Sequence, residues 1–429
     1  MNKEKQDIVP ELRFPSFSLS KGWKQIQLID VTDKNEKWSF IGGPFGSSLK
    51  SSDYVNSSHG VRIIQLQNIG DSKFHNDYKI YTSEEKADEL LSCNIYQGDI
   101  IISKMGDPVG RACIIPNFHD RYVMCSDGIR VVVDESKYSK YFIYLMINSD
   151  FFRKNIEKTA TGSTRKRIGL SALKKLMLFV PEKINEQQKI ADCLSSLDEL
   201  IEAESEKLES LKEHKKGLLQ QLFPAEGQSV PKLRFPEFEN DGEWEETTLG
   251  NVGTFINGRA YKQDELLSAG KYRVLRVGNF FTNKEWYYSN LELGENKYCE
   301  KGDLLYAWSA SFGPRIWHEE KAIYHYHIWK VIEKEEIDRD FLFELLDYET
   351  ERIKAAQANG LGILHITKSG VESWECLIPP TRGEQIKIAE ILSNSQKVIL
   401  AQTEKNNSLK EHKKGLMQQL FPNLNEQKS

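Results

Sequence analysis

The outer segments of this chain occur twice, and this duplication constrains its fold more than any other feature of the sequence. SLKEHKKGLLQQLFP at Ser210–Pro224 recurs with one substitution at Ser408–Pro422, and VPELRFPSF, beginning at Val9, recurs as VPKLRFPEF from Val230. Repeated sequence of this kind marks a repeated supersecondary unit. We therefore predict that the 429 residues form two similar halves.

The interiors of the two copies differ in sequence and in length. The first is about 23 residues longer, because the copies are offset by 221 residues at the front and by 198 at the back. Short stretches still correspond: RIIQLQNI from Arg62 resembles RVLRVGNF from Arg273, and QGDIIISK from Gln97 resembles KGDLLYAW from Lys301. The two copies thus have similar outer segments but interiors of different sequence.

A long heptad-patterned helix is predicted after each interior. Between Glu186 and Leu222 there is no proline, and apolar residues recur in alternating steps of four and three, as in a coiled coil. Such a helix, of about 37 residues, would be roughly 55 Å long. The apolar seam residues are Ile190, Leu194, Leu197, Ile201, Leu208, Leu211, Leu218 and Leu222 in the first copy, and Ile388, Leu392, Ile399, Leu409, Leu416 and Leu420 in the second.

Each interior has the pattern of a mixed α/β domain. Short β-branched runs after turn signals predict strands at 63–69, 99–103, 112–116 and 129–133 in the first interior, and at 272–277, 303–308 and 328–332 in the second. Amphipathic stretches predict one helix in each, at 141–159 and 340–358, and a last strand ends at Pro181 and at Pro380.

These elements predict an α+β chain of two α/β domains, each followed by a long helix, with the two helices paired as an antiparallel coiled coil. The chain ends carry the same QQLFP and VPELRFP segments that meet at the centre, so a circular, pseudo-two-fold arrangement is expected. The predicted boundaries are an arm at 1–20, domains at 21–181 and 242–380, helices at 182–224 and 381–422, a linker at 225–241 and a tail at 423–429.

No catalytic motif is found in the sequence. There is no P-loop, no GxGxxG after a strand and no methyltransferase N/D-P-P-Y/F motif. A nuclease centre at Asp134, Glu135 and Lys137, or a zinc site at His318, His325 and His327, is less well supported than an ordinary loop and an ordinary sheet face. We therefore expect no catalytic residue, metal or cofactor in this chain.

Positive charge is concentrated locally although the net charge is −5. Six basic residues and no acidic residue lie between Lys158 and Lys175, and they surround the glycine- and serine-containing turn TGSTRKR. Backbone amides in such a turn can approach phosphates, and arginine adds charge and bidentate contacts. A solvated basic loop is the alternative. The equivalent ANGLGILHITKSG keeps the glycines but has only His365 and Lys368 as possible contacts.

Candidate DNA-contacting residues are basic, amide, hydroxyl or aromatic side chains on predicted loops and strand ends. Amides can pair with adenine, and glycine- and serine-rich loops suit the phosphate backbone. In the first half they are Ser47, Ser48, Lys50, Gln65, Gln67, Asn68, Lys104, Arg111, Ser163, Thr164, Arg165, Lys166 and Arg167. In the second half they are Arg259, Arg273, Arg276, Asn279, Trp308, Arg315, His365 and Lys368.

Taken together, these segments resemble the DNA specificity subunit of type I restriction–modification systems. The resemblance rests on the GGPFGSSLK loop, the GDIIISK strand, the TGSTRKR turn, the EHKKGLLQQLFP helix end and their two-copy order, and it extends from Trp23 to Pro422. It implies two target-recognition domains that read the halves of a bipartite site in double-stranded DNA, with the helices setting the spacer.

The resemblance also implies protein partners. These are two modification (methyltransferase) subunits and, for cleavage, restriction (translocase and nuclease) subunits, which would carry S-adenosylmethionine, ATP and magnesium. With no signal peptide and no apolar run of about 20 residues, we expect a cytoplasmic protein without a membrane partner. A DNA-binding part of another assembly, such as a fused methyltransferase lacking its catalytic domain, and a pure protein scaffold remain as alternatives.

Overall fold

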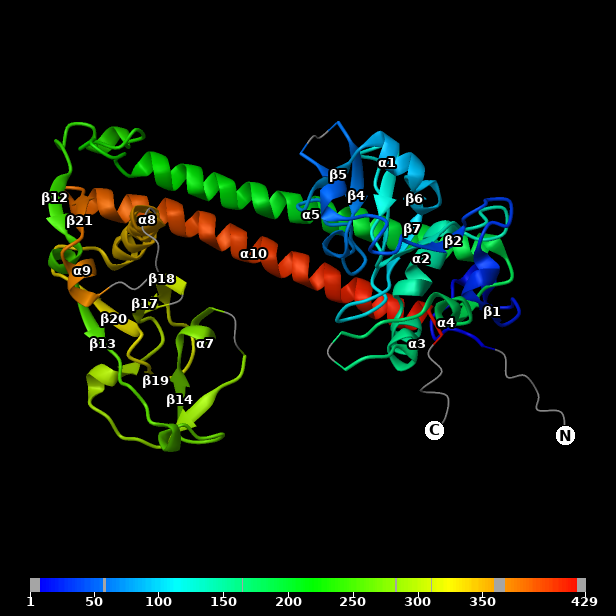
Figure 1. Ribbon diagram of the computed structural model, residues 1–429. Coiled ribbons are helices and arrows are strands. Elements are labelled where there is room, and N and C mark those ends of the chain that lie inside the picture. The colour runs from blue at the N-terminus through cyan, green and yellow to red at the C-terminus, as the bar shows by residue number, and fades with distance from the viewer. Residues whose placement is uncertain are drawn as a thin grey trace. The chain divides into compact units, whose positions relative to one another are not determined.

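The computed structural model describes residues 8–56, 59–163, 165–281, 284–309, 311–358 and 367–422. They form two compact units (Figure 1): unit 1 contains the described residues up to Glu204 and from Lys405 onward, and unit 2 contains those of Ser205–Glu404. Each unit holds one α/β domain together with part of both long helices, α5 (Ile184–Leu222) and α10 (Arg382–Leu420). At 39 residues, each helix is about 58 Å long.

The domain of unit 1 contains a four-stranded antiparallel sheet, a five-stranded sheet and a two-stranded pair. The four-stranded sheet has the order β2 (Phe40–Gly42), β10 (Gly128–Val131), β7 (Ile100–Ser103), β8 (Ala112–Ile114). The five-stranded sheet has the order β3 (Tyr54–Val55), β5 (Ile80–Thr82), β4 (Val61–Ile64), β9 (Tyr122–Met124), β6 (Asn94–Ile95), in which β4 and β9 are parallel. The pair is β1 (Lys24–Gln27) with β11 (Met177–Val180).

Unit 2 repeats this plan, except that its second sheet has four strands among the described residues instead of five. Its four-stranded sheet has the order β13 (Gly253–Asn257), β20 (Ile328–Glu333), β17 (Leu304–Ser309), β18 (Ser311–Ile316). A second sheet has the order β15 (Tyr287–Ser289), β14 (Tyr272–Leu275), β19 (Ala322–Tyr324), β16 (Tyr298–Cys299), again with one parallel pair, β14 and β19. The two-stranded pair is β12 (Glu245–Thr248) with β21 (Glu375–Ile378).

The domain helices are distributed differently in the two units. Unit 1 has α1 (Glu84–Glu89), α2 (Lys140–Asn148), α3 (Asp150–Thr159) and α4 (Leu170–Lys174). Unit 2 has α6 (Leu249–Val252), α7 (Val277–Phe281), α8 (Arg339–Ala358) and α9 (Lys368–Glu372).

The sequence-based prediction of one helix at 141–159 is wrong. Ser149 has an extended backbone, ends α2 and caps α3, since its hydroxyl oxygen accepts the Phe152 amide. Serine competes for backbone hydrogen bonds in this way and favours helix starts. The predicted strands at 63–69 and 272–277 are also too long, because β4 ends at Ile64 and β14 at Leu275.

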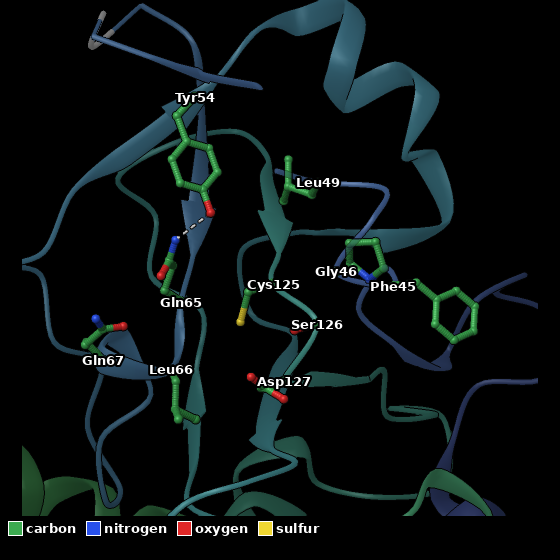
Figure 2. Close-up of a pocket in the computed structure, with 11 residues that line it drawn as sticks. Phe45, Gly46, Leu49, Tyr54, Gln65, Leu66, Gln67, Cys125, Ser126 and Asp127 are labelled. Atoms are coloured by element: carbon green, nitrogen blue, oxygen red, sulfur yellow. Dashed lines mark hydrogen bonds between the residues drawn. The ribbon is translucent and has the colours of Figure 1, made fainter. Parts of the chain in front are cut away.

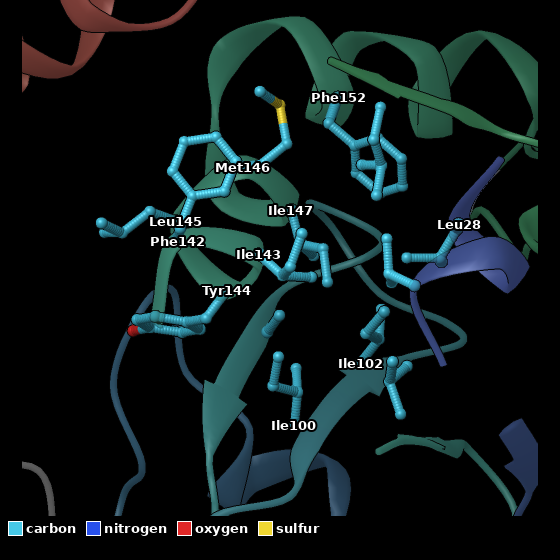
Figure 3. Close-up of a cluster of buried hydrophobic side chains, with 14 of the residues drawn as sticks. Leu28, Ile100, Ile102, Phe142, Ile143, Tyr144, Leu145, Met146, Ile147 and Phe152 are labelled. Carbon is cyan, nitrogen blue, oxygen red and sulfur yellow. The ribbon is translucent and has the colours of Figure 1, made fainter. Parts of the chain in front are cut away.

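The core of unit 1 lies where α2 covers the four-stranded sheet (Figure 3). Figure 3 shows Ile143 and Ile147 of α2 facing Ile100 and Ile102 of β7, and all four side chains are buried. Every residue of α2 from Phe142 to Ile147 is buried, as expected of a helix that is apolar on all sides.

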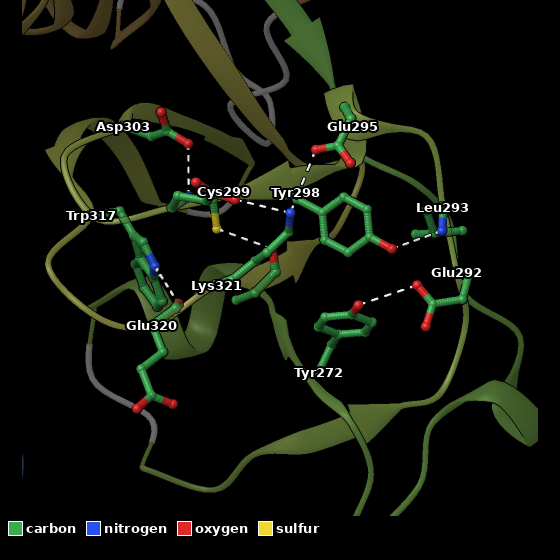
Figure 4. A network of polar contacts seen from close by, with 12 residues as sticks. Tyr272, Glu292, Leu293, Glu295, Tyr298, Cys299, Asp303, Trp317, Glu320 and Lys321 are labelled. Atoms are coloured by element: carbon green, nitrogen blue, oxygen red, sulfur yellow. Dashed lines mark hydrogen bonds and ion pairs between the residues drawn. The ribbon is translucent and has the colours of Figure 1, made fainter.

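In unit 2, loops around β16 and β19 are fixed by polar contacts (Figure 4). Lys321 forms ion pairs with Glu300, at 2.9 Å, and with Glu295, at 3.5 Å. The hydroxyl of Tyr298 accepts the Leu293 amide at 2.8 Å. These exposed charge pairs contribute little stability individually, but they hold the loops that lead into and out of the second sheet.

The duplicated end segments form the same anchor in both units. In unit 1, Arg13 makes a bidentate ion pair with Glu186, at 2.7 and 2.8 Å, and the Trp23 indole donates to the same carboxylate. In unit 2, the corresponding contacts join Arg234 and Trp244 to Glu384. The repeated sequence therefore fastens each domain to the start of a long helix.

The same end segments also form two equivalent junctions. In unit 1, the amide of Leu12 donates to the carbonyl of Gln419 at 2.9 Å, and in unit 2 the amide of Leu233 donates to the carbonyl of Gln221 at 2.9 Å. The segment at Leu12 thus contacts the end of α10 as the segment at Leu233 contacts the end of α5. This is the contact that a circular arrangement requires.

The long helices lie antiparallel within each unit. In unit 1, Lys405 pairs with Glu204 and Lys413 with Asp198, so that residue numbers rise in one helix as they fall in the other. In unit 2, Lys215 donates to Gln396 at 3.2 Å in the same sense. All fourteen residues named for the seam are buried or partly buried.

Candidate nucleic-acid interface

Matching backbone hydrogen bonds define equivalent positions in the two units. In unit 1 they are Gly43 N to Gly128 O, Cys125 N to Ile64 O, Lys104 N to Asp127 O and Gly128 N to Cys125 O. In unit 2 they are Gly258 N to Ile328 O, His325 N to Leu275 O, Trp308 N to His327 O and Ile328 N to His325 O. Four chain segments therefore converge in the same way at one end of the sheets in each unit.

We call this convergence the strand-end face. In unit 1 it comprises residues 43–50, 65–67, 104 and 125–127, and in unit 2 residues 258–261, 276–279, 308 and 325–327. Two of its segments follow β2 or β13 and β4 or β14, and a third precedes β10 or β20. The fourth is Lys104, directly after β7, or Trp308, near the end of β17. The face brings together the candidates Lys50, Gln65, Gln67 and Lys104 in unit 1 and Arg259, Arg276, Asn279 and Trp308 in unit 2.

A pocket of about 160 Å³ lies within the strand-end face of unit 1 (Figure 2). Figure 2 shows Gln65 and Gln67 on one side and Ser126 and Asp127 on the other, and the Gln65 amide nitrogen donates to the Tyr54 hydroxyl at 3.1 Å. Phe45, from the glycine-rich loop, is 86% exposed. Amide, hydroxyl and carboxylate groups beside an exposed aromatic ring are groups that can recognise a nucleic-acid base.

The remaining residues of the glycine-rich loop are accessible. Ser47 and Lys50 are exposed, and Ser48 is partly buried. The Lys50 amide donates to the Asp53 carboxylate at 2.7 Å, which fixes the end of the loop.

Asn68 is buried and not accessible to DNA in this structure, whereas the sequence-based prediction made it a DNA contact. Its side chain is fully buried, its amide nitrogen donates to the carbonyls of His75 and Tyr78, both at 2.8 Å, and its amide oxygen accepts the Gln65 amide. These internal hydrogen bonds fix the loop after β4. The alternation of Gln65, Gln67 and Asn68 in the sequence did not reveal this, because a 3-10 turn at Leu66–Asn68 replaces the strand.

The basic segment of unit 1 is a short hairpin docked beside the strand-end face. Thr161 and Arg167 exchange two backbone hydrogen bonds, and the Ile168 amide donates to the Lys104 carbonyl at 2.9 Å. Gly162 has φ +104°, and a Cβ there would lie 2.8 Å from the Arg165 carbonyl oxygen, so the bend favours glycine. Ser163 and Arg165 are exposed, whereas Thr164 lies outside the described residues.

Some of the predicted basic contacts already have acidic neighbours. Lys166 pairs with Glu157 at 2.6 Å, and Arg167 lies 3.3 Å from Asp127. Arg111 is partly buried, and its Nε has no hydrogen-bond acceptor among the described residues. Arg165 is therefore the exposed guanidinium of this group with the most freedom to meet a phosphate.

The arginines predicted for unit 2 are held by internal contacts. Arg259 makes a bidentate pair with Glu265, at 3.0 and 2.7 Å, and this contact raises its pKa. Arg273 pairs with Glu319 at 2.7 Å, and the Arg276 guanidinium lies 4.3 Å from the Tyr287 ring centre. Their charges are thus less available than the sequence suggests.

The other predictions for unit 2 lie at its loops. Arg315 donates to the Phe280 carbonyl, the Asn279 amide donates to the Glu285 carbonyl at 2.6 Å, and Lys368 lies 3.3 Å from Glu372. His365 lies outside the described residues.

Aromatic and imidazole rings dominate the strand-end face of unit 2. The ring centres of Tyr326 and His327 are 3.9 Å apart, those of Trp308 and His327 are 5.0 Å apart, and the Trp308 indole donates to the Tyr326 carbonyl at 2.9 Å. Burial, with help from His327 and Arg276, lowers the pKa of His325 to about 4. His325 is therefore neutral at physiological pH.

Within the ranges that the structure describes, no group of three or more His, Cys, Asp or Glu residues is placed to hold a metal ion. In the same ranges, no helix has the length and apolar character to cross a membrane.

The sequence model of the type I restriction modification DNA specificity domain matches residues 54–213 and 241–411, which together make up most of the chain. The chain belongs to this family. The two matched regions correspond to the two copies in the sequence.

Individual relatives of this specificity-domain family agree with that assignment. The chain is 25% identical over 377 residues to the putative type I restriction enzyme MjaX specificity subunit of Methanocaldococcus jannaschii, covering 84% of this chain and 86% of the relative. It is 26% identical over 172 residues to a putative type I specificity subunit of Mycoplasma genitalium, covering 40% of this chain and 44% of the relative.

Solved structures share the fold. The S subunit of a type I restriction–modification system from M. genitalium matches with a TM-score of 0.59 and 18% identity, covering 97% of this chain and 100% of that one. A chain from a structure of type I system complex assembly and conformational transition matches with a TM-score of 0.55 and 15% identity, covering 94% of this chain and 98% of that one.

The sequence-based prediction missed Phe45, Ser126, Asp127 and Tyr326 of the strand-end faces, and Tyr54, which lines the pocket of unit 1. The Ser-Asp-Gly signal at 126–128 predicts a turn, but only the folded chain shows that this turn meets the loop at Phe45. The periodicity of the sequence contains no information on such a meeting.

Proposed function

We propose that this specificity-family chain is the non-catalytic DNA-recognition subunit of a type I restriction–modification complex. Each unit would read one half of a bipartite, asymmetric target through its strand-end face. The observation that carries this proposal is that one backbone framework occurs twice with different side chains: amides, Ser126 and Asp127 in unit 1, and Trp308, Tyr326 and His327 in unit 2.

Different side chains on a shared framework suit the reading of two different half-sites. In the major groove each base pair presents its own pattern of donors and acceptors, so an amide or a carboxylate selects partners that an imidazole or a hydroxyl does not. Two identical faces would read two identical half-sites. The different side chains of the two strand-end faces therefore favour an asymmetric target.

Non-specific attraction to DNA would come from the hairpin at 161–167 and from the loop at 43–50. Arg165 and Lys50 are exposed, and backbone amides and hydroxyls of Ser47 and Ser163 lie beside them. Contacts of this type position a protein on the phosphate backbone without reading sequence. The net charge of −5 does not oppose this role, because the basic residues are clustered.

The long helices would set the spacer between the half-sites and dock the partners. Their duplicated ends, Glu213–Pro224 and Glu411–Pro422, offer twin surfaces for two modification subunits. Restriction subunits would join the complex for cleavage. S-adenosylmethionine, ATP and magnesium would be bound by these partners, and the complex would act on DNA in the cytoplasm.

Methylome sequencing tests this function directly. In cells that express the chain with its cognate modification subunit, we expect methylation at one motif of two different half-sites separated by a fixed unread spacer. Cells that express the modification subunit alone are the control and should lack this motif. Absence of any bipartite motif in cells where the complex assembles would refute the proposal.

DNA binding separates this function from that of a pure scaffold. The purified chain should bind duplex DNA weakly, with an affinity that falls steeply as salt increases, and should become sequence-selective when modification subunits are added. A scaffold with two protein-binding domains predicts no affinity for duplex DNA at any salt concentration.

A further inference from the structure

The strand-end faces of the two units differ sharply at one turn. Ser126 and Asp127 precede β10 in unit 1, and Tyr326 and His327 occupy the equivalent positions before β20 in unit 2. The equivalence follows from shared hydrogen bonds rather than from sequence, since the two turns have no residue in common. We call them the variable turns.

The backbone of both variable turns is fixed in the same way. The amide after each turn donates back to the residue before it, from Gly128 to Cys125 at 3.2 Å and from Ile328 to His325 at 2.9 Å. The last carbonyl of each turn accepts the amide of Lys104 or of Trp308. Each turn is therefore closed and tied to the neighbouring strand.

A glycine packs against each variable turn. A Cβ on Gly43 would lie 1.7 Å from the Cys125 carbonyl oxygen, and a Cβ on Gly258 would lie 2.4 Å from the His325 carbonyl oxygen. Neither distance is possible for real atoms, so both positions require glycine for this approach. The framework thus holds the turn backbone tightly while its side chains differ completely.

In unit 1, the variable turn supplies one wall of the pocket beside Gln65 and Gln67. Arg167 lies 3.3 Å from one Asp127 carboxylate oxygen, an arrangement that orients the carboxylate. A carboxylate in this position accepts a hydrogen bond from an exocyclic amino group such as cytosine N4, whereas glutamine amides pair with adenine.

In unit 2, the variable turn offers no carboxylate. Tyr326 is 39% exposed, and its ring packs on His327, which packs in turn on Trp308. This arrangement presents a hydroxyl, an imidazole and aromatic faces, which recognise different base edges and also stack on bases. The difference lies in the chemistry of the side chains and not in the position of the turn.

We infer that the two variable turns are specificity-determining elements, each selecting at least one base pair in the half-site read by its own unit. This inference rests on the proposed function. It assigns base selection to Asp127 in one unit and to Tyr326 and His327 in the other.

Asp127→Asn tests the turn of unit 1 with minimal change in shape. In the assembled complex, we compare methylation at the original motif with methylation at sites altered at one position of one half-site. The preference for the original motif should fall by about 5- to 150-fold, which corresponds to the loss of one base contact. The other half-site should remain unchanged and serves as an internal control. Asp120→Asn, which removes the same charge from an exposed loop of the same domain, should preserve the full motif.

Tyr326→Phe and His327→Gln test the turn of unit 2 and should alter only the opposite half-site. His318→Gln, at an exposed histidine of the same domain, is the matched control. Assembly with modification subunits is measured by size-exclusion chromatography for each variant. Should Asp127→Asn fail to assemble, Ser126→Ala in the same turn is measured instead.

The outcomes distinguish failure of this inference from failure of the proposed function. An unchanged motif in every assembled turn variant would overturn the inference while leaving the proposed function intact. Equal loss of methylation at all sequences would also overturn it, because that is the result of losing a backbone support or a phosphate contact. If the wild-type complex methylates no bipartite motif, the proposed function itself fails.

Discussion

Arg165 is an exposed side chain whose position suits contact with a DNA phosphate. It projects from a hairpin whose two ends, at Thr161 and Arg167, are joined by backbone hydrogen bonds, whereas Lys166 and Arg167 have acidic neighbours. The charge of Arg165 is therefore available to a phosphate. Its task would be to add affinity without adding sequence preference.

We predict that Arg165→Ala weakens binding of the assembled complex to every duplex by a similar factor, about 3- to 10-fold at low salt, and reduces the slope of affinity against salt by about one unit. Fluorescence anisotropy with cognate and non-cognate duplexes measures both quantities. Lys158→Ala, in the same basic segment but on α3, is the comparison variant. A loss confined to the cognate duplex would contradict the assignment of a phosphate contact.

Glu344 is a buried acid whose titration should be visible in the stability of unit 2. Its side chain is 2% exposed, burial raises its pKa to about 7, and Lys215 Nζ at 3.4 Å and the carboxyls of Asp347 and Asp340 are its charged neighbours. The native state thus holds the proton more tightly than the unfolded chain. The stability associated with this proton is complete below about pH 4.5 and is lost as pH rises to about 7.

We therefore predict that Glu344→Gln raises the free energy of unfolding at pH 8, by on the order of 2 kcal/mol, and changes it little at pH 4.5. Urea unfolding at both pH values measures the difference between variant and wild type. Glu335→Gln, at an exposed glutamate shortly before α8, should show no such pH-dependent difference. An equal effect of Glu344→Gln at both pH values would mean that its ionisation is not responsible.

At the scale of elements, the starts of α5 and α10 are held by buried ion pairs that the duplicated segments supply. Arg13 and Glu186 have side chains that are 9% and 1% exposed, and Arg234 and Glu384 are buried to a similar degree. Removing one partner leaves the other charge buried without compensation, which is far more costly than losing an exposed pair.

We predict that Glu186→Gln lowers the stability of unit 1 by about 3 kcal/mol, and that Glu384→Gln does the same in unit 2. Glu182→Gln, which removes an exposed pair with Lys24 close to Glu186, should cost less than about 1 kcal/mol. Chemical unfolding followed by total tryptophan fluorescence measures these losses of stability, and Trp23 and Trp244 lie in the two anchors. Comparable losses for Glu182→Gln and Glu186→Gln would show that the buried pair is not the anchor.

The helices themselves make a prediction about the target. Inserting one heptad into α5 between Glu199 and Leu211, together with a matching heptad in α10 around Lys405, lengthens both by about 10 Å while keeping the seam. The preferred spacer should become longer by about 3 base pairs, with unchanged half-sites, as read by methylome sequencing. An unaltered spacer in an active complex would refute the role of the helices as a spacer.

At the scale of the whole molecule, the two equivalent junctions predict that a circularly permuted chain folds. Joining Pro422 to Val9 through a copy of the Ala225–Ser229 linker and opening the chain within that linker exchanges one junction for the other. Because Leu12 contacts Gln419 as Leu233 contacts Gln221, both junctions have the geometry for a short connection.

The permuted chain should therefore assemble with modification subunits and direct methylation to the unchanged motif. Opening the chain at Gly217, within α5, interrupts a helix and is the control that should fail to assemble. Failure of the permuted chain with linkers of several lengths would argue against the circular organisation.

The sequence alone determined the duplication, the two long helices and the family resemblance. These features are encoded locally: heptad spacing specifies an apolar helix face, and repeated segments such as Ser210–Pro224 and Ser408–Pro422 specify repeated contacts. The strands were found for the same reason, although the end of β4 was misjudged where the Asn68 side chain redirects the backbone. The predicted helix at 141–159 was likewise undivided, whereas Ser149 separates α2 from α3.

Only the tertiary structure decided which residues meet. Gln65, Asp127 and Phe45 lie far apart in the sequence but share one pocket. They meet because Gly43, after β2, and Ile64, in β4, are both hydrogen-bonded to the turn at 125–128. Likewise, Asn68 is buried and has a structural role instead of the predicted DNA contact. Arg259 forms an ion pair with Glu265, which makes its charge less available to DNA. Long-range pairing of strands and competition between neighbouring charges act through space, so local sequence patterns do not record them.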